Sequence, residues 1–515
     1  MNGAESLVRT LLAGDVDVCF TNPGTSEMHF VAALDSVPGM RCVLCLFEGG
    51  VTGAADGFYR MAGRPASTLL HLGPGLANGL SNLHNAKKAG SGIVNIVGEH
   101  ATYHIALDAP LTADIEGIAR PVSHWIRTST SGLDVARDGA EAIAVAKMAP
   151  GQIATLILPG DTAWTEGREP PKMSETPARA QVEDQSIDAA AQLLARGDTT
   201  LLLLGGGALS ERNLQLAGQI RAATGCDLLT EWSNARMDRG AGRVGVLRTP
   251  YVVEQAVTML AKYDRVVLLG SKTPVAFFAY PDKPSVLIPD GCETFELAGV
   301  ADDLDDTLDK LVAATQAQAW EPQGMASLDR PALPSGAIDL DKLGAFLGAM
   351  IPENAIVVDE SITTGRAFFP MTTNAAPHVW LNNRGGSIGY GLPVATGAAL
   401  ACPDRKVIAL EGDGSAMYTV QSLWTMAREN LDVTVLIFSN RSYKILLGEL
   451  TNVGVQNPGP RALDMFSLTR PNLDWVSMSK GMGVPATKVD DCESLIKAFS
   501  SALENAGPNL IEIEM

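Results

Sequence analysis

The sequence predicts an α/β protein with three parallel-sheet domains, because short apolar runs alternate with helical patterns along nearly all of its 515 residues. A chain of this length is too long for a single hydrophobic core. Two polar, proline-containing stretches, 162–186 and 316–336, divide it, and such a composition is typical of linkers. We therefore expect domains at residues 1–162, 186–316 and 337–515.

Each domain takes its expected strands from its apolar runs. These runs are 16–20, 41–47, 67–72, 92–97 and 154–159 in the first domain, 199–205, 226–230, 264–270 and 284–289 in the middle domain, and 355–360, 406–412, 433–440 and 509–515 in the last. Helical spacing separates them, for example at 51–61 and 415–430. Parallel strands joined in this way end at one edge of the sheet, which is where ligands bind.

The composition argues against several kinds of partner. A net charge of -19 would repel the phosphates of nucleic acids and of anionic membranes. The first ten residues lack the basic start and apolar core of a signal peptide, and no apolar stretch is long enough to span a bilayer. Seven scattered cysteines fit a reducing compartment, and the CxxC of Cys42 and Cys45 lies in an apolar run with no second pair at zinc spacing. We expect a soluble, cytoplasmic protein with no nucleic-acid or membrane partner.

A carboxylate follows a buried strand in LEGDGSAMYT, where Asp413 lies between Gly412 and Gly414. GDG alone indicates only a turn. However, the next strand ends at Asn440, 27 residues later (440 − 413), so both side chains are expected at the same sheet edge. The helix start after GDG favours a phosphate, and Mg²⁺ would reconcile that phosphate with the aspartate. The pattern predicts a magnesium site formed by Asp413 and Asn440, with a further ligand from the turn at Ser442.

This arrangement resembles the diphosphate-binding motif of thiamine-diphosphate enzymes, in which two asparagines usually close the motif and Ser439 here takes the first place. The resemblance covers nearly the whole chain and is nearest to benzoylformate decarboxylases and acetolactate synthase large subunits. It implies thiamine diphosphate and Mg²⁺ as cofactors. It also implies a pyrimidine-binding first domain, a Rossmann-like middle domain and a diphosphate-binding last domain. The glycines of LLLLGGGALSE do not form a GxGxxG fingerprint, so FAD is not expected.

The resemblance also implies which residues bind the cofactor. Glu48, in LCLFEGGVTGAADGFYR, matches the glutamate that hydrogen-bonds the pyrimidine nitrogen, although a glutamate at a helix start also commonly complements the helix dipole. In NNRGGSIGYGLP, Ile388 matches the residue that bends the cofactor, and Gly386 matches the carbonyl that accepts from its amino group. The remaining candidates, for the diphosphate, are Ser361, Thr363, Gly412, Gly414, Ser415 and Tyr443.

Three residues are candidates for the substrate side. TNPGTSEMHF resembles the decarboxylases' Asn-Pro-Gly-Ser stretch, so Thr25 and Ser26 are expected to meet the substrate carboxylate. His71, before GPG, matches an active-site histidine, although a lone histidine at a strand end is more often a core residue. The decarboxylases' second histidine falls near TPVAFFAYPD, which contains none, so the proton donor is unassigned. Leu446 and Leu447 are expected to line an apolar pocket that suits an aromatic or branched 2-oxo acid.

By resemblance, the expected reaction is the decarboxylation of a 2-oxo acid through a C2 enamine. The same enamine can attack an aldehyde or a second oxo acid, so an acetolactate-synthase-like carboligase is an alternative. A catalytically silent homologue is another, and the joint presence of Glu48, Asp413 and Asn440 argues against it. Glu48 and Asp413 lie in domains that meet across a subunit interface in the family, so a homodimer is the expected minimum and a homotetramer is common.

Overall fold

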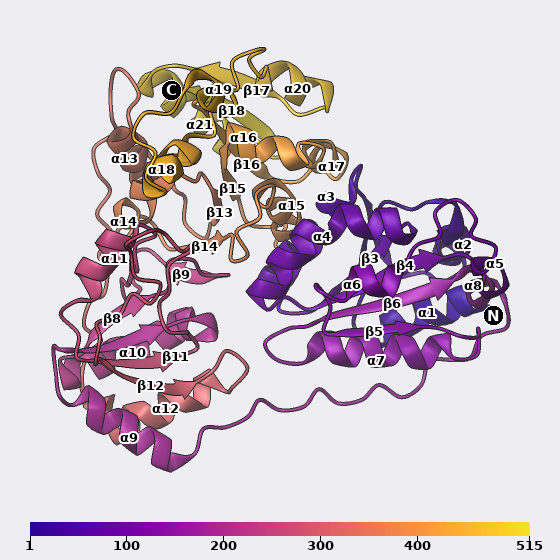
Figure 1. Ribbon diagram of the computed structural model, residues 1–515, viewed down its shortest axis with the longest axis horizontal. Coiled ribbons are helices and arrows are strands. Elements are labelled where there is room, and N and C mark those ends of the chain that lie inside the picture. Colours follow the sequence, from indigo (N-terminus) through magenta and orange to yellow (C-terminus); the bar gives the residue numbers. More distant parts are fainter.

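The computed structural model describes residues 1–515, which form three lobes, each with its own sheet (Figure 1). The N-terminal lobe lies against the C-terminal lobe through helices, and residues 167–183 run as an extended segment from the N-terminal lobe to the middle lobe (Figure 1). The α/β prediction is confirmed. None of the helices combines the length and the apolar composition that a bilayer crossing requires.

The N-terminal lobe contains a six-stranded sheet in the order β2-β1-β3-β4-β6-β5, and all of its pairings are parallel. The strands are β1 (Val18–Thr21), β2 (Arg41–Leu44), β3 (Ala66–Leu70), β4 (Ile93–Glu99), β5 (Trp125–Thr128) and β6 (Ile153–Pro159). The helices are α1 (Gly3–Ala13), η1 (Thr25–Glu27), α2 (Met28–Ser36), α3 (Glu48–Ala62), α4 (Leu72–Ala89), α5 (Thr102–Ile105), α6 (Ile115–Ala119), α7 (Val135–Lys147) and α8 (Gly160–Trp164). Strands β3, β4 and β6 are buried along their whole lengths, as continuous apolar runs predict for a parallel sheet covered on both faces.

The middle lobe contains a five-stranded parallel sheet in the order β10-β8-β7-β11-β12. Its elements are α9 (Asp184–Leu194), β7 (Thr200–Leu204), η2 (Gly206–Leu209), α10 (Glu211–Thr224), β8 (Asp227–Thr230), β10 (Leu247–Arg248), α11 (Val253–Leu260), β11 (Arg265–Leu269), β12 (Glu293–Ala298), α12 (Leu304–Ala314) and η3 (Ala317–Ala319). The strand expected at 284–289 is wrong, because only Val286 forms an isolated bridge there. Pro284 and Pro289 bound that run and lack the N–H groups that a strand ladder needs.

The C-terminal lobe contains a seven-stranded sheet in the order β17-β18-β16-β15-β13-β14-β9. Its strands are β9 (Met237–Arg239), β13 (Ile356–Glu360), β14 (His378–Asn382), β15 (Val407–Gly412), β16 (Val433–Ser439), β17 (Ala486–Val489) and β18 (Asn509–Glu514). Strand β9 comes from the middle range 186–316 and pairs antiparallel with β14, so this sheet is mixed. The expected domain boundaries, 1–162, 186–316 and 337–515, therefore stay a prediction.

Helices follow the strands of this last sheet and are joined to them by its loops. They are α13 (Leu340–Met350), η4 (Thr364–Ala367), α14 (Phe368–Met371), α15 (Gly391–Ala401), α16 (Asp413–Ala416), η5 (Met417–Thr419), α17 (Ser422–Arg428), α18 (Lys444–Asn452), α19 (Pro460–Asp464), α20 (Trp475–Gly481) and α21 (Cys492–Glu504). The single helix expected after GDG is divided into α16, η5 and α17. The chain after the GDG turn therefore changes direction before its longer helix begins.

Helices α3 and α15 join the first and last lobes into one core. They approach so closely that a Cβ atom on Gly57 would lie 2.1 Å from the carbonyl oxygen of Val394. A Cβ on Gly397 would lie 1.9 Å from the carbonyl oxygen of Ala54. One cluster of 46 buried apolar residues includes members of both lobes, so the two sheets share a core within one chain. The small residues of α3 are thus needed for helix packing.

A buried histidine makes the C-terminal lobe sensitive to acid. His378 begins β14 opposite Arg239 of β9, and its Nδ1 donates to the Ala376 carbonyl at 2.7 Å. Its Nε2 is buried without a partner. Burial, together with the charge of Arg239, lowers the pKa of His378 from 6.5 to about 3, so the side chain is neutral at pH 7.

Acidification should therefore destabilise the wild-type protein more than a His378→Asn variant. The folded-state pKa lies below the unfolded value, so the stability from neutral His378 is present above pH 6.5 and is lost as the pH falls toward 3. At pH 4.5 the loss should be about 2.7 kcal/mol. Urea unfolding of both proteins at pH 7.5 and 4.5 measures it, with His104→Asn, a half-exposed histidine, as the control. Parallel losses in wild type and His378→Asn would contradict the expectation.

Candidate active site

The Asp413 carboxylate lies at the C-terminal end of β15 and at the start of α16, and it is buried. Its Oδ1 accepts from the Gly414 N–H at 2.9 Å, and its Oδ2 accepts from the Arg441 N–H at 2.6 Å. Arg441 follows Asn440 and has a left-handed φ of 56°, so the chain turns sharply beside the aspartate. The structure thus brings Asp413 and the turn after β16 together.

These groups fit a hard divalent cation. The Asn440 Oδ1 accepts from the Ser442 N–H at 3.0 Å, which orients the side chain within the same turn. Burial raises the pKa of Asp413 to about 6 against the opposing effect of backbone N–H donors, and no lysine or arginine side chain forms an ion pair with it. A buried carboxylate without a cationic partner is costly, and Mg²⁺ with oxygen ligands would remove that cost.

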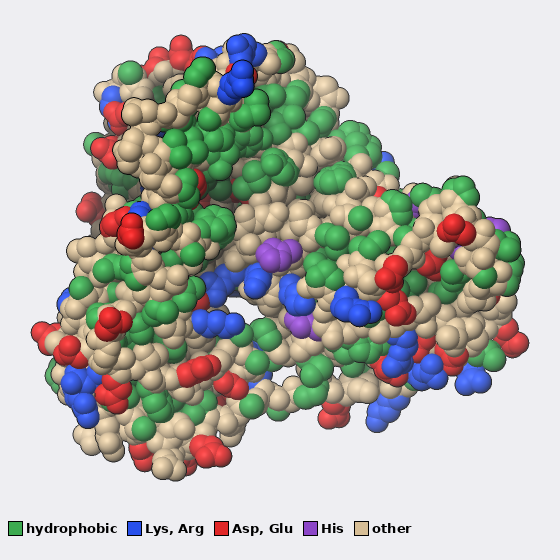
Figure 2. All heavy atoms as spheres, viewed as in Figure 1, with side chains coloured by type: hydrophobic (Ala, Val, Ile, Leu, Met, Phe, Trp, Pro, Cys, Tyr) green, Lys and Arg blue, Asp and Glu red, His purple; other side chains and the backbone are tan.

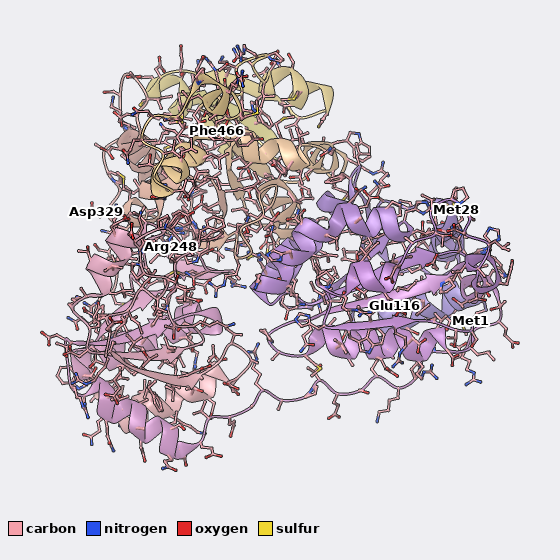
Figure 3. The ribbon with its side chains drawn as sticks, in the orientation of Figure 1. Met1, Met28, Glu116, Arg248, Asp329 and Phe466 are labelled. Atoms are coloured by element: carbon pink, nitrogen blue, oxygen red, sulfur yellow. The ribbon has the colours of Figure 1, made fainter.

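The glycines and Tyr443 shape the space around Asp413. A Cβ on Gly414 would lie 2.4 Å from the Cε1 of Tyr443, so only glycine lets this ring approach the turn. The Tyr443 N–H donates to the Phe466 carbonyl at 2.9 Å, and Figure 3 places Phe466 within the C-terminal lobe. Ser415 is buried in the first turn of α16, where a Cβ on Gly412 would lie 3.5 Å from its hydroxyl oxygen. These candidates line one turn at the sheet edge.

The two hydroxyls of the ESITTG segment differ in availability. Ser361 is buried and its hydroxyl donates to the Asp359 Oδ1 at 2.5 Å. Thr363 precedes η4, and its side chain makes no capping hydrogen bond. Between them Ile362 has a φ of 50°, which is unusual for a β-branched residue and indicates local backbone strain. Of the two, Thr363 has the free hydroxyl.

The loop that contains Gly386 and Ile388 precedes α15. Gly386 and Gly389 have left-handed φ angles of 82° and 88°, so both positions favour glycine. Ile388 between them is half-buried. A Cβ on Gly386 would lie 2.7 Å from the Cζ of Phe277, so an aromatic ring of the middle lobe rests against this loop.

The structure also brings together two glutamates that sequence reasoning missed. Glu360 is the last residue of β13, and it pairs in register with Glu411, the last residue but one of β15. Glu360 accepts from the N–H groups of Tyr390 at 3.0 Å and Gly391 at 3.0 Å. Both Glu411 oxygens are buried without a partner. Burial, followed by the charge of Glu360, raises the pKa of Glu411 well above its ordinary value. A carboxylate that ends an apolar strand was the signal that identified Asp413, and it applies here too.

Glu48 is the first residue of α3 and is half-buried. Its Oε2 accepts from the Asn78 side chain at 3.0 Å, across from α4. Within this chain, no hydrogen bond or ion pair joins Glu48 or His71 to Asp413 or Asn440. The candidate residues therefore form two groups, one in each of the outer lobes.

The second group is a hydrogen-bonded cluster around His71. The Ser26 hydroxyl lies 3.2 Å from the His71 Nδ1 and donates to the Glu27 Oε1 at 2.5 Å. The same Nδ1 lies 2.8 Å from the Glu27 Oε2, which also accepts from the Gly24 N–H at 2.8 Å. Thr25 begins η1 beside this cluster and is exposed. Glu27 thus orients both the serine and the histidine.

Glu27 was not predicted, although it directly follows the two candidates in GTSE. Its side chain is almost fully buried at the end of a strand–turn segment, and a Cβ on Gly98 would lie 1.7 Å from its Oε1. Leu72, directly after His71, has a left-handed φ of 47°. Backbone strain next to candidate site residues is thus found at Leu72, Ile362 and Arg441.

Replacing Glu27 with glutamine should lower turnover without weakening cofactor binding. The amide keeps the size of the side chain but cannot accept from serine, histidine and backbone together, so His71 loses its orientation. We expect kcat to fall about 10- to 100-fold. Steady-state kinetics and calorimetry of cofactor binding measure this, with Asp35→Asn on the exposed face of α2 as the matched control. Unchanged kcat would rule out an orienting role.

An aromatic cluster from the middle lobe lies beside the loop at Gly386. The Phe277 ring packs edge-on against Trp232 and Phe278, with centroids 5.2 Å and 4.7 Å away. Tyr251 joins this cluster at 5.6 Å from Phe277, and its hydroxyl donates to Glu449 of α18 at 3.3 Å. Figure 2 shows hydrophobic side chains gathered on the C-terminal lobe, in the upper part of the view.

Helix α18 carries the two leucines predicted for the pocket. Leu446 and Leu447 are each 38% exposed, and no residue of α18 is buried. The hydroxyl of Tyr280 donates to Glu449 at 2.7 Å, and Lys283 donates to Asn452 at 3.0 Å. The middle lobe therefore holds this otherwise exposed helix in place.

Two family models and several known proteins match this chain. Residues 1–118 match the family model "Thiamine pyrophosphate enzyme, N-terminal TPP binding domain", and residues 364–513 match "Thiamine pyrophosphate enzyme, C-terminal TPP binding domain". "Putative acetolactate synthase large subunit IlvX" of Mycobacterium tuberculosis is 48% identical over 100% of this chain and 99% of its own length. Benzoylformate decarboxylase of Pseudomonas aeruginosa is 29% identical over 96% of this chain and 95% of its own. The solved thiamine diphosphate-dependent 4-hydroxybenzoylformate decarboxylase of Rhodococcus jostii RHA1 has the same fold, with a TM-score of 0.88, 24% identity, and coverage of 100% of this chain and 99% of that one.

Proposed function

Because the chain belongs to the thiamine pyrophosphate enzyme family, we propose that it is a thiamine-diphosphate- and Mg²⁺-dependent enzyme that decarboxylates a 2-oxo acid. The observation that carries this proposal is the pairing of two sites. A buried carboxylate without a cationic partner lies at one sheet edge, and a Ser26–His71–Glu27 cluster follows the strands of the other lobe. The carboxylate site would suit a metal-bound diphosphate, and the Ser26–His71–Glu27 cluster would suit a substrate carboxylate.

Asp413, Asn440 and the turn at Ser442 would hold Mg²⁺. Thr363, Ser415 and the glycines beside Asp413 would hold the diphosphate through hydroxyl and backbone donors at the start of α16. Thiamine diphosphate, when bound, supplies a nucleophilic carbon and an electron sink for the loss of CO₂.

The protein's own groups would place protons and exclude water. The Glu48 carboxylate would hold a proton at the cofactor's pyrimidine ring, in a half-buried position where charge interactions are strong. His71, oriented by Glu27, would hold or donate a proton beside the substrate, and Ser26 and Thr25 would bind its carboxylate. Tyr443 and Ile388 would exclude water from the cofactor.

The apolar side chains expected at the substrate side favour an aromatic or branched 2-oxo acid over pyruvate. Phe277 and Phe278 occupy the segment where a second histidine was expected, and they bring no proton donor. Their rings, together with Leu446 and Leu447 of α18, would contact an apolar side chain on the substrate. In this arrangement the proton for the product would come from His71 or from water.

A carboligase is the second candidate, favoured by the 48% identical relative named as an acetolactate synthase large subunit. In that case a second oxo acid or an aldehyde would take the acyl unit in place of a proton. The lack of a second histidine supports this alternative, because slow protonation leaves time for another acceptor to react.

We also propose that the functional unit is at least a homodimer, with a homotetramer as the larger assembly, in the cytoplasm. Glu48 and Asp413 form no hydrogen bond or ion pair in their own chain, which supports an arrangement in which they meet one cofactor across a subunit interface. Exposed apolar side chains on the N-terminal lobe, such as Met28 (Figure 3), Tyr103 and Leu107, offer surface for such contacts.

A turnover panel tests the proposed function. The purified protein with thiamine diphosphate and Mg²⁺ is given benzoylformate, phenylpyruvate, a branched 2-oxo acid or pyruvate, and both CO₂ and the organic product are measured. CO₂ with an equal amount of aldehyde supports decarboxylation, and CO₂ with a hydroxy-ketone product supports carboligation. Bound cofactor without CO₂ from any acid would overturn both and leave the silent homologue.

A further inference from the structure

We infer that Asn82 and Asn85 of α4 are positioning residues that hold the loop 385–389, with Ile388 at its centre, against the helix that begins at Glu48. The inference rests on the proposed function, in which this loop contacts one cofactor and Glu48 of the same chain contacts the cofactor bound by a second chain. It assigns a role to two side chains of the N-terminal lobe, in the stretch SNLHNA, that the sequence analysis did not single out.

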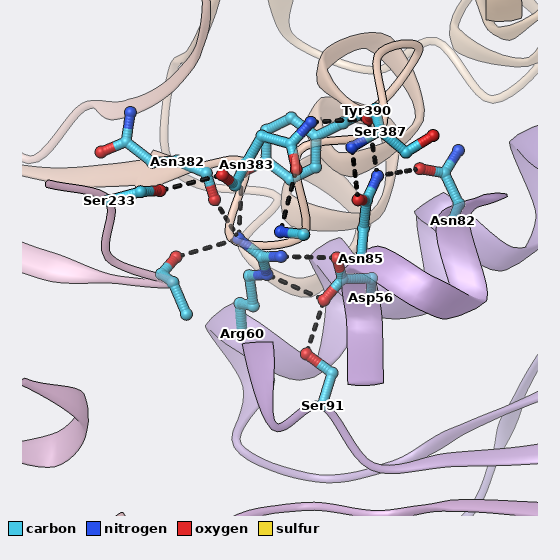
Figure 4. A network of polar contacts seen from close by, with 12 residues as sticks. Asp56, Arg60, Asn82, Asn85, Ser91, Ser233, Asn382, Asn383, Ser387 and Tyr390 are labelled. Atoms are coloured by element: carbon cyan, nitrogen blue, oxygen red, sulfur yellow. Dashed lines mark hydrogen bonds and ion pairs between the residues drawn. The ribbon is translucent and has the colours of Figure 1, made fainter. Parts of the chain in front are cut away.

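Asn85 binds both backbone polar groups of Ser387 in the loop (Figure 4). Its Nδ2 donates to the Ser387 carbonyl at 2.8 Å, and its Oδ1 accepts from the Ser387 N–H at 3.1 Å. The asparagine is fully buried, and a Cβ on Gly385 would lie 2.4 Å from its Oδ1. One side chain thus satisfies both polar groups of the residue directly before Ile388.

Asn82 connects this contact to the helix of Glu48. Its Nδ2 donates to the Gly49 carbonyl at 2.9 Å and to the Gly389 carbonyl at 3.1 Å, and its Oδ1 accepts from Asn85 at 2.9 Å. Gly49 directly follows Glu48, and Gly389 directly follows Ile388. A single buried amide therefore bridges the neighbours of two candidate cofactor residues from different lobes.

The remaining sides of the loop are also held, so the asparagines complete an enclosure (Figure 4). The Oδ1 of Asn383 accepts from the Gly386 N–H at 2.8 Å, and its Nδ2 donates to the Ser387 carbonyl at 2.6 Å. From the middle lobe, the Ser233 hydroxyl donates to the Asn383 carbonyl at 2.9 Å, and its own carbonyl accepts from Arg384 at 2.6 Å. The middle lobe thus holds the two residues directly before the loop, and its Phe277 ring lies beside Gly386.

Helix α3 also contacts the chain on either side of the loop, through Arg60. Arg60 is buried and donates to both carboxylate oxygens of Asp56 at 2.8 Å and 2.7 Å (Figure 4). Its Nη1 donates to the Asn382 carbonyl at 2.7 Å and to the Tyr390 hydroxyl at 3.0 Å. Helix α3 therefore contacts the chain just before and just after the loop, while α4 contacts the loop itself.

The physical need for this enclosure comes from the glycines. Three of the five residues in the loop are glycines, which give a free loop many backbone conformations. A cofactor that must be held bent by Ile388 would have to select one of them, at a cost in binding free energy. Fixing the loop through Asn82 and Asn85 removes that cost before the cofactor arrives.

The test compares Asn85→Ala with wild type and with Ser81→Ala, an exposed residue on the same helix whose side chain makes no hydrogen bond. Hydrogen–deuterium exchange of the cofactor-free protein is followed in peptides that cover 383–391. We expect about tenfold faster exchange there in Asn85→Ala, with other regions unchanged. Calorimetry with thiamine diphosphate at saturating Mg²⁺ should show a Kd raised about tenfold, and kcat should fall while the substrate KM stays within about twofold.

Unchanged loop exchange or an unchanged cofactor Kd in Asn85→Ala would overturn the inference, as would faster exchange throughout the molecule. If Asn85→Ala does not fold, Asn85→Asp serves instead. It keeps the size and the acceptor of the side chain but cannot donate to the Ser387 carbonyl, so the same shifts are expected. Failure of the proposed function is separate, because it appears as wild-type protein that releases no CO₂ from any 2-oxo acid, whereas the exchange measurement needs neither cofactor nor turnover.

Discussion

Glu48→Gln is expected to lower kcat for 2-oxo acid turnover about 10²- to 10⁴-fold, the range for removing a group that transfers a proton. The amide has the size of the carboxylate and can still meet Asn78, so the start of α3 should stay in place. The thiamine diphosphate Kd should therefore change by no more than about threefold. Single-turnover kinetics and calorimetric titration measure the two effects.

Glu504→Gln is the matched control for this change. Glu504 ends α21, is exposed, and its side chain forms no hydrogen bond or ion pair, so it loses the same charge at a position remote from the site. We expect wild-type kcat in this variant. Full turnover in Glu48→Gln would remove the proton-relay role of Glu48 and, with it, the assignment of the N-terminal lobe to the pyrimidine ring.

Asp413→Asn should abolish the advantage that Mg²⁺ gives to cofactor binding. The amide keeps one acceptor oxygen but loses the negative charge that offsets the cation in a buried position. We expect the Kd for thiamine diphosphate at saturating Mg²⁺ to rise about 100-fold, which corresponds to about 2.7 kcal/mol. Titrations of wild type and variant with and without EDTA measure the difference.

The control for the metal site is Asp490→Asn. Asp490 is exposed, and its side chain forms no hydrogen bond or ion pair, so its loss of charge tests whether any aspartate near the C-terminus alters binding. EDTA should weaken cofactor binding in wild type and in Asp490→Asn, and should have little further effect in Asp413→Asn. A Mg²⁺ response in Asp413→Asn equal to that of wild type would place the metal elsewhere.

Residues at strand ends were the easiest to predict from the sequence. Asp413 and Asn440 each end an apolar run, and parallel strands put such ends at one edge, so their approach follows from topology. Glu360 and Glu411 carry the same signal and are paired in the same sheet, yet they were missed because no motif drew attention to them. Glu27 was missed for a related reason, since its role depends on an orientation toward His71.

The errors in the predicted elements have local causes. The run at 284–289 is apolar enough for a strand, but its prolines cannot complete a ladder. The helix after GDG was expected to be continuous because periodicity reports a buried face and does not show where the axis bends. Strand β9 could not be assigned to the last sheet, because its three residues carry little pattern and its partner is far along the chain.

By itself the sequence determined the α/β class and the placement of Asp413 and Asn440 at neighbouring strand ends, because both depend on apolar runs and on the order of parallel strands. The roles of Glu48, His71 and Ile388 come from the resemblance and stay predictions. Only the tertiary structure decided that Asn82 and Asn85 hold the loop of Ile388 and that a middle-lobe aromatic cluster rests on Gly386. Such contacts join residues hundreds of positions apart through backbone carbonyls. Every residue has a carbonyl, so nothing in the sequence marks which ones will meet.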